Sequence, residues 1–144
     1  MPNQIKTLDV PIAVVPGGKI RMYEDQAFGA TTYNGSVDFG EWKLVHASSG
    51  KILEWLKSSR FNNFSFGDPD IGFVPYPDKW KKLESLKSGQ HRDLEITVVW
   101  EHQPGLYEFM NGRHRAMWLA FHDAEFVPIL VPPHQVAHFK AILE

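Results

Sequence analysis

The sequence predicts a single domain of the α+β class. Its 144 residues match the size of one domain with a proper core. Segments rich in β-branched residues predict strands, and segments in which apolar residues recur at helical spacing predict helices. Aromatic residues make up 13% of the chain, so we expect a core built on large rings.

Composition excludes several classes of site. The chain has no cysteine, which excludes disulfides, thiolate metal sites and cysteine nucleophiles. The formal net charge of −2 provides no chain-wide basic field, so any contact with nucleic acid must come from a local patch. No apolar segment approaches the length of a membrane span, and the first residues lack the pattern of a signal peptide. We therefore expect a cytoplasmic protein that makes no membrane contact.

The first half of the chain predicts three strands, at 8–15, 19–23 and 41–45. The first two are joined by a turn at Pro16-Gly17. Residues 28–40 show no helical period and predict a loop. Ser48 or Ser49 is expected to cap a helix that ends near Arg60.

The second half begins with an irregular connection over 61–77. Asp78 is expected to cap a helix that stops at Gly89. A Pro104-Gly105 turn then predicts a hairpin. The remaining expected elements are strands over 94–100, 106–110 and 127–131, a helix from Arg115 that is apolar on nearly all sides, and an amphipathic helix over 134–144.

A candidate site lies where the strand that ends at Asn111 turns directly into a helix at Gly112. The first turn of a helix exposes unpaired backbone N–H groups and the positive end of its dipole, so it attracts anions. Arg113 and Arg115 add guanidinium groups that match phosphate oxygens, and Gly112 lets the backbone approach a ligand. The pattern predicts phosphate binding. The alternative is that the arginines are solvated and His114 is a hydrogen-bonded filler.

Catalysis at this turn would need an acid or base and a carboxylate. His114 is expected to donate to a phosphoryl oxygen, or to act as acid or base if its pKa lies near neutrality. Hydrolysis or phosphoryl transfer also needs a carboxylate that orients water or a metal. Among Glu95, Glu101 and Glu108, the catalytic candidate is Glu108, together with Arg113 and His114. The alternative for each glutamate is a solvated strand charge.

Two further groups precede the turn. A basic run predicts either a solvated helix face or a patch that joins the arginines of the turn; it consists of Lys79, Lys81, Lys82, Lys87 and Arg92. Aromatic side chains predict either core and lid positions or surfaces that stack on a base; they are Phe61, Phe64, Phe66, Phe73, Tyr76 and Trp80.

The order of elements from 74 to 131 resembles the core of the ParB/sulfiredoxin superfamily. Two segments carry the likeness: Pro77-Asp-Lys-Trp-Lys-Lys-Leu-Glu-Ser-Leu86, and Ile96-Thr-Val-Val-Trp100 followed by Tyr107-Glu-Phe-Met-Asn-Gly-Arg-His-Arg-Ala116. With the later Trp-Leu and Val-Pro-Ile-x-Val-Pro, the sequence is most similar to plasmid fertility inhibition factors within that superfamily. The resemblance implies one ParB/sulfiredoxin-like domain over 1–144, with a small mixed sheet flanked by helices.

The resemblance also implies a nucleotide-binding site. Gly112, His114 and Arg115 match the superfamily's phosphate-gripping turn, and Lys79 matches a lysine that reaches the nucleotide in sulfiredoxins. The expected nucleotide-binding residues are Lys79, Asn111, Gly112, Arg113, His114 and Arg115. The expected ligand is ATP or another nucleotide, accompanied by Mg²⁺. No protein residue is assigned as a metal ligand.

Two departures from the superfamily limit what it implies. Arg113 stands where sulfiredoxins have their catalytic cysteine, so sulfinic acid reduction is excluded. Only 13 residues follow Val131, where ParB proteins continue with a helix-turn-helix DNA domain, so we do not expect centromere binding in the ParB manner.

The function that the resemblance implies is interference with conjugative DNA transfer by a nucleotide-binding protein, through ATP or DNA hydrolysis. The expected partners are a nucleotide and either DNA or a conjugative-transfer protein. One alternative is a non-catalytic module that docks on a transfer or secretion component. Another is a small-molecule kinase of the same superfamily, which would need a placed carboxylate base.

Overall fold

A computed structural model describes residues 6–24, 42–62, 70–90 and 92–144. The loop expected over 28–40, together with Phe64 and Phe66, lies outside these ranges. The described elements are β1 (Lys6–Pro11), η1 (Pro16–Gly18), β2 (Lys19–Glu24), β3 (Lys43–Ala47), α2 (Ser49–Ser58), β4 (Arg60–Phe61), β5 (Asp70–Ile71), α3 (Pro77–Glu84), η2 (Ser85–Ser88), β6 (Leu94–Glu95), β7 (Thr97–Gln103), β8 (Leu106–Asn111), α4 (Arg113–Phe121), β9 (Val127–Val131), η3 (Pro133–Gln135) and α5 (Val136–Leu143).

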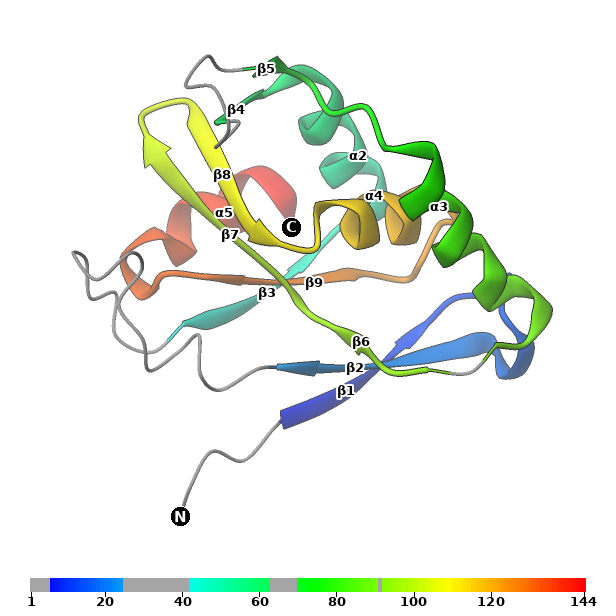
Figure 1. Ribbon diagram of the computed structural model, residues 1–144. Helices are drawn as coiled ribbons and strands as arrows, with labels where there is room; N and C mark the ends of the chain where they lie inside the picture. The colour runs from blue at the N-terminus through cyan, green and yellow to red at the C-terminus, as the bar shows by residue number, and fades with distance from the viewer. Residues whose placement is uncertain (1–5, 25–41, 63–69, 91) are drawn as a thin grey trace.

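The strands form two mixed sheets. The larger sheet has the order β3-β9-β7-β8-β4-β5, and the smaller has the order β1-β2-β6. Parallel pairs are β7 with β9 and β4 with β8 in the larger sheet, and β2 with β6 in the smaller. Helices α2 and α4 lie on one side of β9, and the smaller sheet lies on the other (Figure 1). The predicted α+β class is confirmed.

The strand predicted over 94–100 is two strands that belong to different sheets. Leu94–Glu95 pairs with β2, whereas Thr97–Gln103 pairs with β8 and β9. Ile96 lies between them, and its N–H donates to the carbonyl of Tyr23 (2.8 Å). The β-branched run predicted extended backbone correctly but could not show that the chain changes sheets there.

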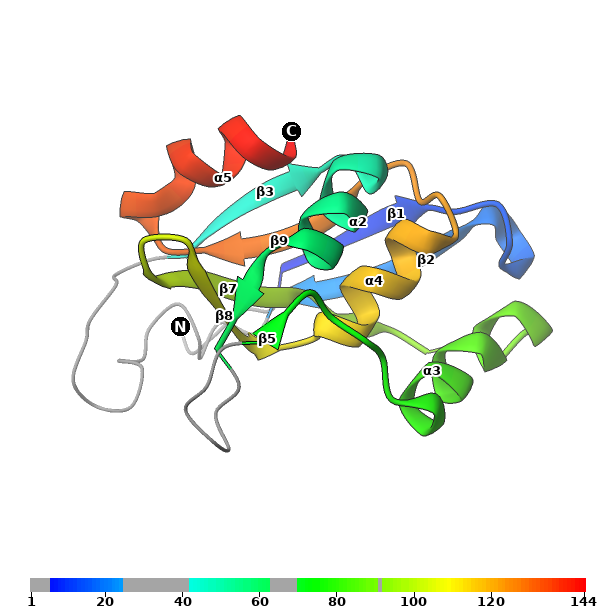
Figure 2. The ribbon, with the colours of Figure 1, turned by 90° about the horizontal axis from the view of Figure 1, so that it is seen from above.

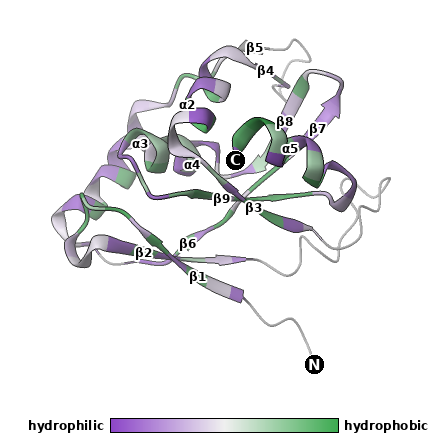
Figure 3. Cartoon of the chain, turned by 180° about the vertical axis from the view of Figure 1, so that it is seen from behind, coloured by the Kyte–Doolittle hydropathy of each residue, from purple (hydrophilic) through white to green (hydrophobic). Residues whose placement is uncertain are grey.

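The core is built on aromatic rings, as the composition predicts. The Trp55 ring lies 5.0–6.2 Å, between centroids, from the rings of four neighbours: Phe61, Tyr107, Phe109 and Phe139. Apolar residues dominate β9, whose five residues are all buried (Figure 3). Helix α4 buries six of its nine residues, among them Trp118, so the prediction of a sandwiched helix is confirmed.

Three helix starts differ from the prediction, and one of them is that of α5, which begins at Val136 after η3 and not at residue 134. Helix α3 begins at Pro77 after Tyr76, not after Asp78, because proline suits the first helical position, where its missing N–H needs no partner. Its last turn is the 3-10 helix η2, which stops at Gly89 as predicted. Helix α4 begins at Arg113, two residues before the expected start. Among the described residues, no helix has the length and apolar character to cross a bilayer.

Candidate functional site

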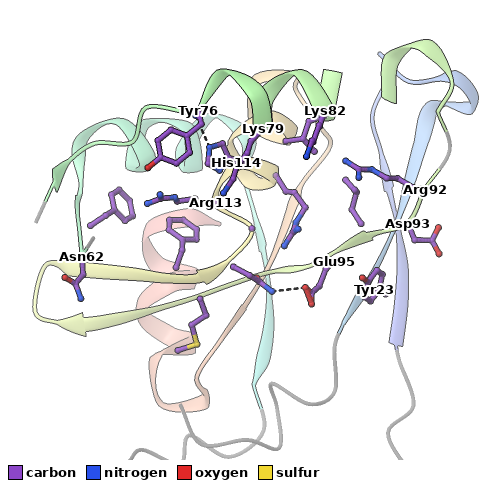
Figure 4. Close-up of a pocket in the computed structure, with 18 residues that line it drawn as sticks. Tyr23, Asn62, Tyr76, Lys79, Lys82, Arg92, Asp93, Glu95, Arg113 and His114 are labelled. Carbon is purple, nitrogen blue, oxygen red and sulfur yellow. Dashed lines mark hydrogen bonds between the residues drawn. The ribbon is translucent and has the colours of Figure 1, made fainter. Parts of the chain in front are cut away.

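A pocket of about 640 Å³ opens beside the turn from β8 into α4. Its walls come from β2, β6, β8, α3 and α4 (Figure 4). All six residues predicted to bind nucleotide line it: Lys79, Asn111, Gly112, Arg113, His114 and Arg115. The structure thus brings Lys79 of α3 to the same hollow as the turn residues, which lie more than thirty residues later in the sequence.

Gly112 permits the turn. Its φ of 77° lies in the left-handed region that side chains disfavour. A Cβ atom there would lie 2.6 Å from Nη2 of Arg115 and 2.8 Å from Oγ1 of Thr97. That Thr97 hydroxyl donates a hydrogen bond to the Gly112 carbonyl (2.8 Å). The first helical bond of α4 runs from the Ala116 N–H to the same carbonyl (3.0 Å), so the preceding N–H groups lack helical acceptors.

The pocket is electropositive. Five cationic side chains line it, and none of them forms an ion pair within the described ranges: Lys79, Lys82, Arg92, Arg113 and Arg115. Two carboxylates also line it, and one of these, Asp93, is paired with Arg21 at 3.1 Å. The whole chain carries a net charge of −2, so this positive hollow is a local feature.

Aromatic rings hold Arg113 in place. Its guanidinium carbon lies 5.0 Å from the centroid of the Phe73 ring and 5.9 Å from that of Tyr76. Cation–π contact of this kind positions a guanidinium without neutralising its charge. The donors of Arg113 therefore remain available to an anion.

Arg115 is half-buried, and two of its guanidinium nitrogens lack hydrogen-bond partners. Its Nε and Nη2 atoms are buried and find no acceptor among the described residues. Burial lowers the pKa of this guanidinium, and the nearby charge of Glu95 opposes that effect. Buried donors without acceptors cost free energy, so a bound anion that accepted from these two nitrogens would remove that cost. A rotation of the side chain toward the anion would break no hydrogen bond at either nitrogen.

His114 is a neutral, buried acceptor. Its Nε2 accepts a hydrogen bond from the backbone N–H of Tyr76 (3.0 Å). Burial lowers its pKa to about 4, with further contributions from Lys79, Arg113 and Arg115. Since the ring is neutral at pH 7 and Nε2 is occupied, the geometry does not support the acid or base role expected from a pKa near neutrality.

Glu108 does not line the pocket. Its side chain is only 2% exposed, and both oxygens accept hydrogen bonds, from Trp100 Nε1 (2.8 Å) and from Asn62 Nδ2 (2.6 Å). The adjacent Tyr107 and Phe109 rings pack on Trp55, so by strand alternation Glu108 points to the other face of the sheet. The carboxylate chosen as the catalytic candidate therefore lies apart from the turn.

Glu95 is the carboxylate that faces the pocket together with Asn111. The Nδ2 of Asn111 donates to Oε2 of Glu95 (2.9 Å; dashed in Figure 4), and the Oδ1 of Asn111 accepts from the Val98 N–H (2.9 Å). Asn111 thus ties β8 to β6 and β7 as well as lining the hollow. Sequence reasoning did not assign Tyr23 or Asp93, because only the parallel pairing of β2 with β6 brings them to this wall.

The comparisons with known proteins add no relative. No family model, no curated protein and no solved structure matches the chain. What the pocket does must therefore be argued from its own geometry, which gathers cationic side chains, the N–H groups of a helix start and a half-exposed aromatic ring around one hollow.

Proposed function

We propose that the protein binds a nucleotide, with ATP as the first candidate, and that the phosphates lie at the N-terminus of α4. The observation that supports this most directly is that Lys79, Arg113 and Arg115 line one hollow with the free N–H groups of that helix. Each of these groups favours phosphate oxygens. The hollow of about 640 Å³ is also of the size that holds small ligands, roughly 300–1,000 Å³.

The setting we propose is interference with conjugative DNA transfer, in the cytoplasm. It is supported by the resemblance of the turn, and of the lysine helix before it, to plasmid fertility inhibition factors of the ParB/sulfiredoxin superfamily. In this protein the lysine helix borders the turn, since Lys79 of α3 lines the pocket with the turn residues and the N–H of Tyr76, just before α3, donates to His114 Nε2 (3.0 Å).

Hydrolysis of ATP or DNA would be a further step. It requires a carboxylate that orients water, and Glu95 takes the place that we assigned to Glu108, because Glu95 lines the pocket. Mg²⁺ would be held mainly through the phosphates of the ligand. Replacement of Glu95 by Gln should then abolish phosphate release and leave nucleotide binding in place.

Isothermal titration with Mg·ATP tests the binding proposal. We expect Arg115→Gln to weaken binding about ten- to a hundredfold, because one charge-assisted hydrogen bond contributes about 1.5–3 kcal/mol. Lys79→Ala should also weaken it. Lys81→Ala is the matched control, because it removes the same charge from the same helix at a position outside the pocket.

The absence of binding to the native protein at millimolar ATP, ADP and CTP would contradict the proposal. It would favour the non-catalytic module that docks on a transfer component. Phosphate release at ATP concentrations below saturation that is undiminished in Arg115→Gln would come from a contaminating enzyme.

A further inference from the structure

The segment over residues 72–76, which we call the strap, connects β5 to α3. Figure 2 shows this green connection beside the first turn of α4. Its first residue is fixed against the end of α2. The N–H of Gly72 donates to the Ser59 carbonyl (2.7 Å), and a Cβ on Gly72 would lie 2.5 Å from the carbonyl oxygen of Lys57. The φ of Gly72 is 79°, so only glycine suits this close approach.

His114 fixes the other end of the strap. Its Nε2 accepts the N–H of Tyr76 (3.0 Å), and its ring meets that of Phe73 edge to face, with centroids 4.9 Å apart. The His114 side chain is buried on the rigid first turn of α4, where only 7% of the residue is exposed. The strap is therefore held to the same turn that supplies the phosphate-binding groups.

The strap presents the Tyr76 ring at the pocket. This residue is 52% exposed and lines the hollow, whereas most of the aromatic rings in the described ranges are buried in the core. Lys79 Nζ lies 5.6 Å and the Arg113 guanidinium 5.9 Å from its centroid. Figure 4 shows Tyr76 beside Arg113, with Lys79 and His114 close by. An exposed ring next to a group of cations suits a ligand that joins an aromatic base to phosphates.

We infer that Tyr76 is the stacking surface for the base of the bound nucleotide and that His114 is a positioning residue that holds Tyr76 there. This inference rests on the proposed function. It assigns the two ends of the ligand, with phosphates at Arg113 and Arg115 and the base at the strap. Because Nε2 of His114 already accepts the Tyr76 N–H, this side chain could contact a phosphate only through its Nδ1–H.

The test compares Mg·ATP with inorganic tripolyphosphate, which has no base, by isothermal titration. We expect Tyr76→Ala to weaken ATP about 5- to 100-fold, the range that base–aromatic stacking contributes, and to weaken tripolyphosphate far less, because the closer Phe73 ring still holds Arg113. Tyr76→Phe keeps the ring and should behave as the native protein. Val74→Ala is the matched control on the strap, since Val74 is exposed and does not line the pocket.

His114 is tested by two replacements. His114→Leu removes the acceptor of the Tyr76 N–H, so it should lower the affinity for ATP and spare tripolyphosphate. His114→Gln offers a carbonyl oxygen near the position of Nε2 and should restore ATP binding. Tyr76→Ala changes an exposed side chain, so the inference stays testable even if His114→Leu does not fold.

Two results separate this inference from the proposed function. If the ratio of the two affinities is the same in Tyr76→Ala and in the native protein, stacking on Tyr76 is wrong and the phosphate site stands. If the native protein binds neither ATP nor tripolyphosphate, the phosphate site itself is wrong.

Discussion

Two separate requirements at position 112 exclude any residue with a side chain. Its backbone must adopt a positive φ to turn from β8 into α4, and the space where a Cβ would stand is taken by Arg115 and Thr97. The first demand is conformational, and the second is steric. Gly105 in the β7–β8 hairpin has only the conformational requirement. Its φ is the same 77°, but a Cβ there would meet no described atom within 4 Å.

Gly105→Ala should therefore lower the free energy of unfolding by the conformational cost alone, about 1–2 kcal/mol. Gly112→Ala should cost more than that, because Thr97 lies in a buried strand that cannot move aside, and it should also abolish ATP binding. Urea unfolding of both variants measures the difference. If the two substitutions lower the free energy of unfolding equally, the atoms around Gly112 make room for a Cβ without any loss of stability.

The residues next to one another in the sequence were the easiest to assign to the site. Gly112, Arg113 and Arg115 follow from the strand-to-helix turn, and the resemblance adds Lys79. The alternative of a hydrogen-bonded filler describes His114 as the structure has it, but its partner Tyr76 could not be predicted, because Tyr76 lies 38 residues away. Glu108 was preferred to Glu95 because the sequence does not show which strand face meets the turn.

Between α3 and α4, one carboxylate connects the two helices. Glu84 Oε1 accepts from Trp118 Nε1 (2.9 Å) and contacts His122 Nε2 (2.7 Å), and Oε2 accepts from Lys87 Nζ (2.9 Å). Hydrogen bonds from Lys87 and His122, in that order, lower the pKa of Glu84 from 4.5 to about 2. Helical periodicity predicted the buried face of α3 but not this contact, which depends on where α4 packs.

Glu84→Gln should destabilise the protein at pH 7. Since the folded pKa lies below the unfolded one, the stabilisation is present above pH 4.5 and is lost as the pH falls toward about 2. The difference in melting temperature between the native protein and Glu84→Gln should therefore shrink over that range. Thermal melts at a series of pH values measure it, with the exposed Glu54→Gln on α2 as control. A difference that stays constant with pH would contradict the assignment.

The strand predictions worked where the signal is local. The hairpin at Pro104-Gly105 and the five-residue β9 follow from turn residues and β-branched runs. The two-residue strands β4 and β5 carry too short a pattern to be seen, and the region over 61–77 was expected to be irregular. Such strands form because β8 offers an edge to Arg60–Phe61, which is a property of the assembled sheet.

For the whole molecule, the α+β class follows from the sequence but the division into two sheets does not. The pocket depends on that division. Tyr23, Asp93 and Glu95 belong to the smaller sheet or its approach, whereas Asn111 and the α4 turn belong to the larger sheet and its helix layer. No local pattern marks this junction, because a single run of residues supplies a strand to each sheet.

Because Ile96 alone separates the two strands, the sheets meet at a one-residue joint with no loop to absorb movement. A ligand bound in the pocket contacts residues of both sheets and should therefore oppose their separation. Saturating ATP at about a hundredfold above its dissociation constant contributes about 2.7 kcal/mol to the bound state. Amides of β1 that exchange through separation of the sheets should then exchange about a hundred times more slowly, although β1 lines no part of the pocket. Deuterium exchange measures the rate of the β1 amides with and without ATP. A β1 rate that is unaltered in the ligand-bound protein would contradict this prediction.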